Sequence, residues 1–167
     1  MNEGERLSLS GMTRERCHAF YRGYESDPAL FMDMDRFQPF IYRSEWVDAR
    51  FDAHRQQGRL MFAILLGERV IGELEFKQMD REAGTCVLGI ALQNDSVKGK
   101  GYGTEAERQA LCYAFDELGM QTVYADAVLK NVRSQHVLEK VGVRLIREEG
   151  DFRYYACTKP KRDGMAF

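Results

Sequence analysis

The sequence Lys98-Gly99-Lys100-Gly101-Tyr102-Gly103-Thr104 lies between an apolar stretch, residues 86–92, and a stretch with helical periodicity, residues 104–118. This order predicts a strand, a short polar loop and a glycine-rich turn that opens a helix. Three alternating glycines leave successive backbone N–H groups unshielded by Cβ atoms, and the first helical turn adds its own unpaired donors and dipole. We therefore expect the loop to bind an anion, most favourably phosphate.

The backbone alone would suffice for this binding. A charge-assisted hydrogen bond contributes roughly 1.5–3 kcal/mol, so three or four N–H groups would hold a diphosphate. Lys98 and Lys100 then add to the attraction of the anion without defining the site.

Other interpretations of the loop require a different glycine spacing. A nucleoside-triphosphate loop needs G-x-x-x-x-G-K-S/T, which the sequence lacks. A dinucleotide loop needs G-x-G-x-x-G and an acid about 20 residues later. Asp126 lies near that distance, but the glycines alternate and position 104 is Thr. A plain connecting turn remains an open alternative.

Length and composition predict a single soluble domain over residues 1–167. The chain has 44% hydrophobic and 30% charged residues, which is typical of a globular protein. A net charge of -2 gives no general attraction to nucleic acid or to an anionic membrane. We expect neither as a partner, and we expect a monomer or a homodimer.

The four cysteines, Cys17, Cys86, Cys112 and Cys157, are scattered and form no C-x-x-C motif. They predict reduced thiols and neither a disulfide framework nor a metal site. The N-terminal residues are charged, and no apolar run of 18 residues occurs. We therefore expect a cytoplasmic protein without a signal peptide or a membrane span.

The rest of the chain predicts alternating strands and helices. Thr13 is expected to cap a first helix that runs to Tyr24, and Ser44 a second helix that ends near residue 57. Between them, residues 26–39 are turn-rich and aromatic. The strand at 122–128 follows a crossover helix and should pair parallel to an earlier strand. The expected strands are 7–10, 59–66, 70–78, 85–92, 122–128, 143–147 and 153–158, the other helices are 104–118 and 131–141, and 160–167 is expected to be a loose tail.

Two blocks in residues 89–143 resemble the GNAT superfamily of acetyl-CoA-dependent N-acetyltransferases, in particular the branch that includes the ribosomal-protein N-terminal acetyltransferases. The loop from Lys98, continued to Ala106, looks like the family's Q/R-x-x-G-x-G/A pyrophosphate loop. Residues 131–143, NVRSQHVLEKVGV, look like that branch's N-x-x-S-x-x-V-x-E-K-x-G-F. The blocks cover about a third of the chain, and the rest agrees in the order of its elements.

This resemblance implies an α/β (α+β) fold. It has a mixed, mostly antiparallel sheet of about seven strands and about four flanking helices, the acyl-CoA N-acyltransferase fold. Two neighbouring parallel strands, here 86–92 and 122–128, would splay apart and receive the pantetheine arm of acetyl-CoA. The CoA-binding core would span about 85–143.

The resemblance also assigns cofactor-binding residues. Backbone groups at Leu92 and Gln93 would bind pantetheine, and Asn131 and Ser134 would reach the cofactor from the next helix. The pyrophosphate would lie on Lys98, Gly99, Lys100, Gly101, Tyr102, Gly103 and Thr104.

Two positions depart from the family pattern. The loop begins with Lys98 where Gln or Arg is usual, and lysine meets phosphate as a point charge without a planar fork. The tyrosine that many members use as general acid falls at Leu138, which cannot donate a proton. This second departure supports an alternative, an acyl-CoA-binding module of the same fold that has lost catalysis.

Acetyl transfer needs a neutral amine, a stabilised oxyanion and a proton for the leaving thiolate. Glu73 and Glu75 alternate with apolar residues and share one face of their strand. They are candidates for the base, with a solvated outer face as the other interpretation. Ser134 is the candidate acid, or an early-turn serine that satisfies the backbone, and Tyr154 and Tyr155 are weaker candidates.

The amine requirement favours some acceptors. At pH 7.4 roughly a quarter to a third of an α-amine is neutral, but only about 0.1% of a lysine amine. We expect direct transfer of acetyl from acetyl-CoA to a primary amine, because no cysteine has an identifiable activating partner. N-terminal peptides, polyamines and aminoglycosides all remain open, and a nucleotide-binding regulator is a further alternative.

Overall fold

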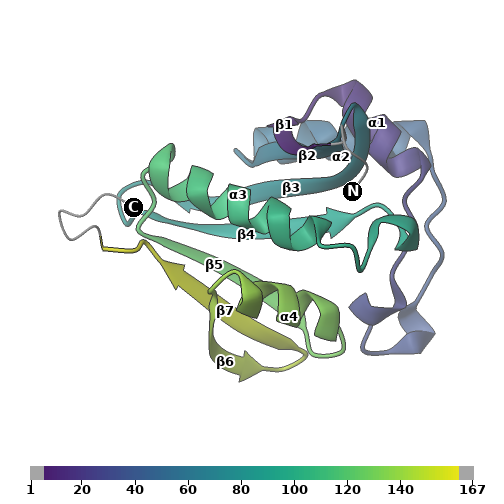
Figure 1. Cartoon of the computed structure of the whole chain (residues 1–167). Coiled ribbons are helices and arrows are strands. Elements are labelled where there is room, and N and C mark those ends of the chain that lie inside the picture. Colours follow the sequence, from purple (N-terminus) through teal and green to yellow (C-terminus); the bar gives the residue numbers. More distant parts are fainter. Residues whose placement is uncertain (1–5, 162–167) are drawn as a thin grey trace.

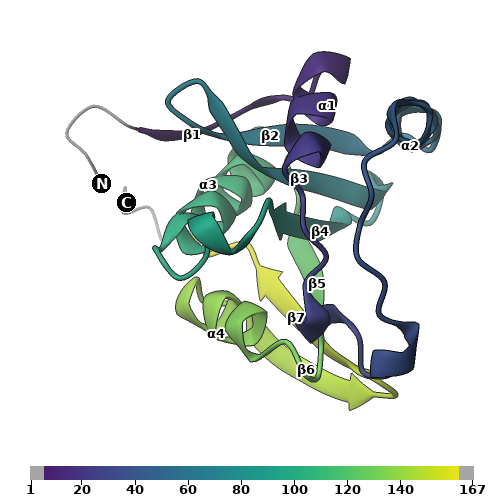
Figure 2. The same cartoon turned by 90° about the vertical axis from the view of Figure 1, so that its right-hand side faces the viewer.

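The computed structural model describes residues 6–161, and within them the chain forms a seven-stranded sheet with helices on both faces (Figures 1 and 2). The strand order is β1-β2-β3-β4-β5-β7-β6. The strands are β1 (Leu7–Gly11), β2 (Leu60–Leu66), β3 (Arg69–Asp80), β4 (Thr85–Leu92), β5 (Thr122–Val128), β6 (Arg144–Glu149) and β7 (Phe152–Thr158). The helices are α1 (Arg14–Arg22), α2 (Ser44–Gln56), α3 (Tyr102–Asp116) and α4 (Val132–Lys140), with short turns η1 (Pro28–Leu30), η2 (Met34–Arg36) and η3 (Asp95–Val97).

The described strands pair antiparallel everywhere except between β4 and β5. The chain leaves β4, crosses over through α3 and returns in β5, and such a crossover gives a parallel neighbour. The predicted α/β fold with a mostly antiparallel sheet and one parallel pair is therefore confirmed.

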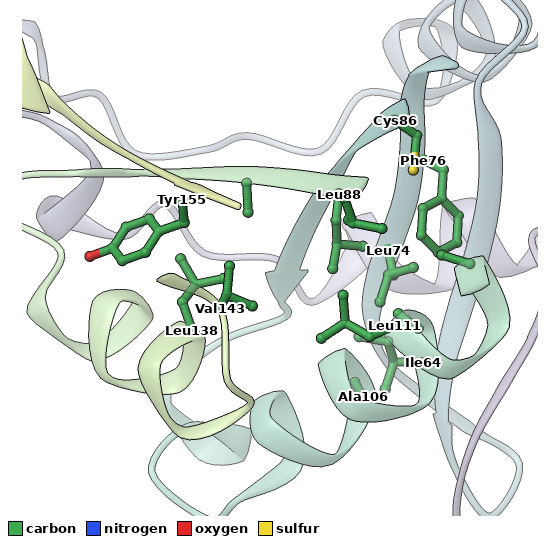
Figure 3. Close-up of a cluster of buried hydrophobic side chains, with 14 of the residues drawn as sticks. Ile64, Leu74, Phe76, Cys86, Leu88, Ala106, Leu111, Leu138, Val143 and Tyr155 are labelled. Atoms are coloured by element: carbon green, nitrogen blue, oxygen red, sulfur yellow. The ribbon is translucent and has the colours of Figure 1, made fainter. Parts of the chain in front are cut away.

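The sheet separates two apolar clusters. Alternate residues of β3, such as Leu74 and Phe76, face α3 and join its buried alanines (Figure 3). On the other face, α1 and α2 bury Phe20 and Val47 over β2. Because side chains alternate along a strand, Glu73 and Glu75 of β3 lie on the α1–α2 face.

Most element boundaries agree with the sequence predictions within about two residues, as expected for frayed ends. Thr13 caps α1 as predicted, since its hydroxyl oxygen accepts a hydrogen bond from the Arg16 N–H at 3.2 Å. The predicted cap at Ser44 is wrong. Arg43 is the extended residue before α2, and its carbonyl accepts the first helical hydrogen bond, from the Val47 N–H at 3.1 Å. Ser44 is thus already the first residue of the helix.

Helix α3 begins two residues earlier than predicted, at Tyr102. Gly101 adopts the left-handed conformation and acts as the N-cap, so Tyr102 and Gly103 belong to the first turn. Of the predicted tail at residues 160–167, residues 162–167 lie outside the described residues.

We predict that Phe76→Ala lowers the free energy of unfolding by about 3–5 kcal/mol, because it empties a fully buried ring position beside Phe62 and Tyr113. Urea unfolding followed by circular dichroism measures the change. Leu145→Ala, at a half-exposed position of β6, is the control and should stay within about 0.5 kcal/mol. Equal effects of the two substitutions would contradict this core.

Candidate active site

The glycine loop presents a row of free backbone donors at the start of α3. Gly99 and Gly101 have φ angles of 71° and 86°, which an L side chain rarely adopts. A Cβ at either position would meet no atom within 4 Å, so backbone conformation and not space requires glycine there. Within the described chain, no hydrogen bond uses an N–H of residues 99–104. The loop therefore has the donors that an anion needs.

Lys98, by contrast, is already paired. Its ammonium group lies 2.9 Å from Asp27 Oδ2 and 3.6 Å from Asp95 Oδ1, and its side chain is only 10% exposed. Although burial acts in the opposite direction, the hydrogen bond from Lys98 lowers the pKa of Asp27. Lys98 thus ties the segment between α1 and α2 to the loop, and the exposed Lys100 is the lysine without such a partner.

Strands β4 and β5 diverge beside the loop. They pair at only three positions, and the last pair is Val87 with Tyr124. Beyond these positions, residues 88–92 of β4 and 125–128 of β5 do not pair with each other. A gap therefore opens in the middle of the sheet (Figure 2). This divergence is the splayed pair that the family resemblance implies.

Two pockets meet in this gap. We call the first the loop pocket; it is lined by Leu92, Lys98, Gly103 and Ser134, among others. The second, the gap pocket, is lined by Leu88, Ala125, Ala127 and Leu138, among others. Both pockets also contain Leu30, Ile90, Glu107 and Asn131. The shared lining makes one continuous path from the glycine loop into the sheet.

The two predicted backbone positions on β4 differ in their surroundings. Leu92 lines the loop pocket. Gln93 is buried, its N–H donates to the Ile71 carbonyl at 2.8 Å, and its carbonyl accepts from the Glu25 N–H at 3.0 Å. Its side chain also donates to the Phe20 carbonyl at 2.8 Å. Gln93 therefore anchors α1 to the end of β4 and leaves no backbone group free for a ligand.

Helix α4 places Asn131 and Ser134 on the pocket wall. Asn131 caps the helix, and its Oδ1 accepts from the Ser134 N–H at 3.2 Å. The Ser134 hydroxyl has no hydrogen bond in the described chain, so it is not used by the backbone. His136 is exposed.

Glu73 and Glu75 share a third pocket on the α1–α2 face, which we call the glutamate pocket. Its other walls include Met12, Met61 and residues 89–91 of β4. Residues 89 and 90 also line the gap pocket, so the two pockets share this segment of β4.

Neither glutamate belongs to a solvated outer face. Glu73 accepts hydrogen bonds from the Tyr21 hydroxyl at 2.7 Å and from the Arg50 guanidinium at 3.0 Å. Burial raises the pKa of Glu73 above its ordinary value, against the opposing effects of Arg50 and Tyr21. Glu75 pairs with Arg59 at 2.7 Å and contacts His54 at 3.2 Å. The carboxylates are fixed in place by partners distant in sequence.

The sequence analysis missed Glu107 on α3. It is 2% exposed, lines both the loop and gap pockets, and its Oε2 atom is fully buried without a hydrogen-bond partner in the described chain. Burial raises the pKa of Glu107 to about 8. A signal was present, since residue 107 is four and seven positions before the buried Leu111 and Ala114 and so falls on the apolar face of α3.

The other candidates lie away from these pockets. Tyr155 is fully buried in the core beside Leu138 and Val143 (Figure 3). Tyr154 points to the other face of β7, under the Arg147 guanidinium at 4.4 Å. Burial raises the pKa of Cys17 and of Cys86 to about 11, which disfavours a thiolate nucleophile at either position.

The aromatic residues between α1 and α2 pack on one another and on rings of the two helices. Phe40 contacts Tyr21, Tyr24 and Trp46, and Phe31 contacts Phe37. Within residues 6–161, no helix combines the length and apolar character of a membrane span. In the same part of the chain, no group of three or more His, Cys, Asp or Glu side chains is placed to hold a metal ion.

Comparisons with known proteins agree with this geometry. A family model described as an acetyltransferase (GNAT) domain matches residues 6–144. "Uncharacterized N-acetyltransferase p20" of Bacillus licheniformis is 26% identical over 159 residues, which are 93% of this chain and 86% of that protein. "Probable N-acetyltransferase YjcK" of Bacillus subtilis (strain 168) is 38% identical over 76 residues, which are 45% of this chain and 41% of that protein.

A solved structure shows the same fold. The spermidine N-acetyltransferase from Vibrio cholerae in complex with CoA and spermine superposes with a TM-score of 0.74 at 16% identity, over 91% of this chain and 95% of that one. The family model spans most of the chain, including the glycine loop, the diverging strands and α4. The chain therefore belongs to the GNAT acetyltransferase family and is an N-acetyltransferase.

Proposed function

We propose that the protein transfers acetyl from acetyl-CoA directly to a primary amine, either a protein N-terminus or a small amine. The observation that carries this proposal is the continuous path from the free N–H groups of residues 99–104 into the gap between β4 and β5. A diphosphate fits the donors, and an extended arm fits a gap edged by unpaired strand backbone. The solved relative's complex with CoA and spermine supports a CoA donor and an amine acceptor.

The amine would enter from the α1–α2 face through the glutamate pocket. That pocket meets the gap pocket at residues 89 and 90, so the acceptor and the donor would meet at this segment of β4. A neutral amine nitrogen attacks the thioester carbon, the C–S bond breaks, and the thiolate leaves. The amine proton passes to Glu73, directly or through water, and the thiolate is protonated from Ser134 or solvent.

Glu73 is the better base of the two glutamates. Its raised pKa brings it closer to the working pH, where a general base is most effective. Tyr21 and Arg50 hold the carboxylate in one position. Because this base is weak, an α-amine or another amine of lowered pKa is the favoured acceptor.

A module that binds acyl-CoA without turnover remains the competing function, favoured by Leu138 in place of a proton-donating tyrosine. Release of free thiol from acetyl-CoA, assayed with N-terminal peptides, polyamines and aminoglycosides, separates the two functions. Turnover with any of them supports the transferase. Tight binding without turnover across the panel supports the module, and thermal stabilisation by NAD but not by acetyl-CoA would refute both.

The remaining expectations belong to the same proposal. They are the single domain over residues 1–167, the similarity to the ribosomal-protein acetyltransferase branch, a monomer or homodimer, and a cytoplasmic location. We also propose that the protein binds no nucleic acid, membrane or metal.

We predict that Gly101→Ala weakens acetyl-CoA binding by about 5–30-fold, because the left-handed conformation costs an alanine roughly 1–2 kcal/mol and the relaxed loop misaligns its donors. Isothermal titration measures the affinity. Gly119→Ala is the matched control, since Gly119 has a φ of 69° and open space around it but lies at the far end of α3. It should lose similar stability and keep its affinity; equal loss of affinity in both variants would speak against the loop as the diphosphate site.

We further predict that Glu73→Gln lowers kcat/KM by about 10²–10⁴-fold, because it removes the proton acceptor while retaining the shape of the side chain. Steady-state thiol release measures the effect, and the affinity for acetyl-CoA should be unchanged. Glu75→Gln, in the same pocket, is the control and should have a much smaller effect. A larger effect at Glu75 would transfer the role of base to that residue.

A further inference from the structure

Glu107 is a buried acid without a hydrogen-bond partner in the described chain, at the junction of the loop pocket and the gap pocket. Neither of its oxygens has a hydrogen bond in the described chain, and Oε2 is wholly enclosed. A buried polar group without a partner costs free energy, so such a group is retained where something else satisfies it. Glu107 lines both the loop pocket and the gap pocket and is one of the residues that they share.

Burial disfavours the charged form of this carboxyl group. Desolvation raises the pKa of Glu107 to about 8 and is the only cause of the shift, so no neighbouring charge stabilises the anion. A protonated carboxyl group has one O–H donor and a carbonyl acceptor. At neutral pH, Glu107 therefore offers a hydrogen-bond donor in the wall of the path.

Several other charged and titratable groups line the two pockets. The walls contributed by β4 contain none, because residues 88–92 are Leu, Gly, Ile, Ala and Leu. Asp27 and Lys98 neutralise each other through their ion pair. The remaining groups are Tyr24 and Glu25 after α1, Lys77 on β3, Asp126 on β5 and Arg133 on α4.

We propose that Glu107 binds the acyl-CoA donor by donating a hydrogen bond from its uncharged carboxyl group to an amide carbonyl oxygen of the pantetheine arm. This inference rests on the proposed function, in which that arm runs from the glycine loop into the gap. The arm carries two amides, and each loses water on entering the gap. A strand edge presents both carbonyl and N–H groups, and a side-chain donor on α3 would satisfy an amide carbonyl that the edge does not reach.

Few other side chains near the overlap can supply that donor. Leu30 and Ile90 are apolar. Asn131 uses its Oδ1 atom to cap α4, so only its side-chain NH2 group is left to donate a hydrogen bond to the arm. Glu107 and Asn131 thus provide donors from α3 and α4, on two sides of the path, and fix the depth of the arm.

A pH-dependent affinity follows. Ionisation of Glu107 removes the O–H donor and leaves an anion against the carbonyl oxygen, so only the protonated protein binds well. With a pKa of about 8, the protonated fraction falls from about nine-tenths at pH 7 to about one-tenth at pH 9. The apparent affinity should therefore weaken about tenfold across this range.

The test is isothermal titration of acetyl-CoA into four full-length proteins at pH 7, 8 and 9. Wild type should show the tenfold weakening. Glu107→Gln keeps a donor that cannot ionise, and it should bind equally well within about threefold at every pH. Glu107→Leu keeps the volume without the donor and should bind at least fivefold more weakly than Glu107→Gln at pH 7. Glu117→Gln makes the same substitution at an exposed position after α3 and should retain the wild-type profile.

The outcomes distinguish failure of the role of Glu107 from failure of the proposed function. Parallel pH profiles for wild type and Glu107→Gln, or equal affinities of the Gln and Leu variants, would overturn the role of Glu107 and leave the proposed function intact. Absence of acetyl-CoA binding by wild type would overturn both.

A ligand-free measurement supports the protonation state on its own. Because the pKa is higher in the folded protein than in the unfolded chain, the folded state binds the extra proton, and wild type loses stability as the pH rises toward 8. The melting temperature of Glu107→Gln should therefore exceed that of wild type increasingly from pH 5 to pH 8. A constant difference would contradict a neutral Glu107.

Discussion

The structure depends on the point at which β4 and β5 stop pairing. Backbone groups at the middle of a sheet are normally satisfied by the neighbouring strand. Here the parallel pairing ends at Val87 and Tyr124, and the rest of both strands diverges. The unpaired edges, the glycine loop that follows β4 and the start of α4 all open onto the same space. We propose that the diphosphate of CoA binds the glycine loop and that its amide-containing arm lies in this gap.

The segment between α1 and α2 is fastened to this site at two points. Lys98 pairs with Asp27, and Gln93 holds the end of α1 through its side chain and backbone. Both contacts join residues about 70 positions apart in the sequence. The segment after α1 is therefore held beside the glycine loop and the end of β4 by residues that are distant in sequence.

Local features of the site could be predicted from the sequence, whereas its long-range pairings could not. The alternating glycines, the Thr13 cap and the parallel strand after α3 follow from backbone preferences and chain order, and the structure confirms them. The ion pair of Lys98, the occupied backbone of Gln93 and the partners of Glu73 depend on tertiary contacts. Glu107 was missed because a glutamate in a helix is ordinarily exposed.

The most direct test of the account is the amide spectrum of the 15N-labelled protein during titration with CoA. The account predicts that the largest chemical-shift changes occur at the N–H groups of residues 99–104, followed by those of residues 88–92 along the gap. Unchanged loop amides at saturating CoA, with the major changes elsewhere in the molecule, would contradict it.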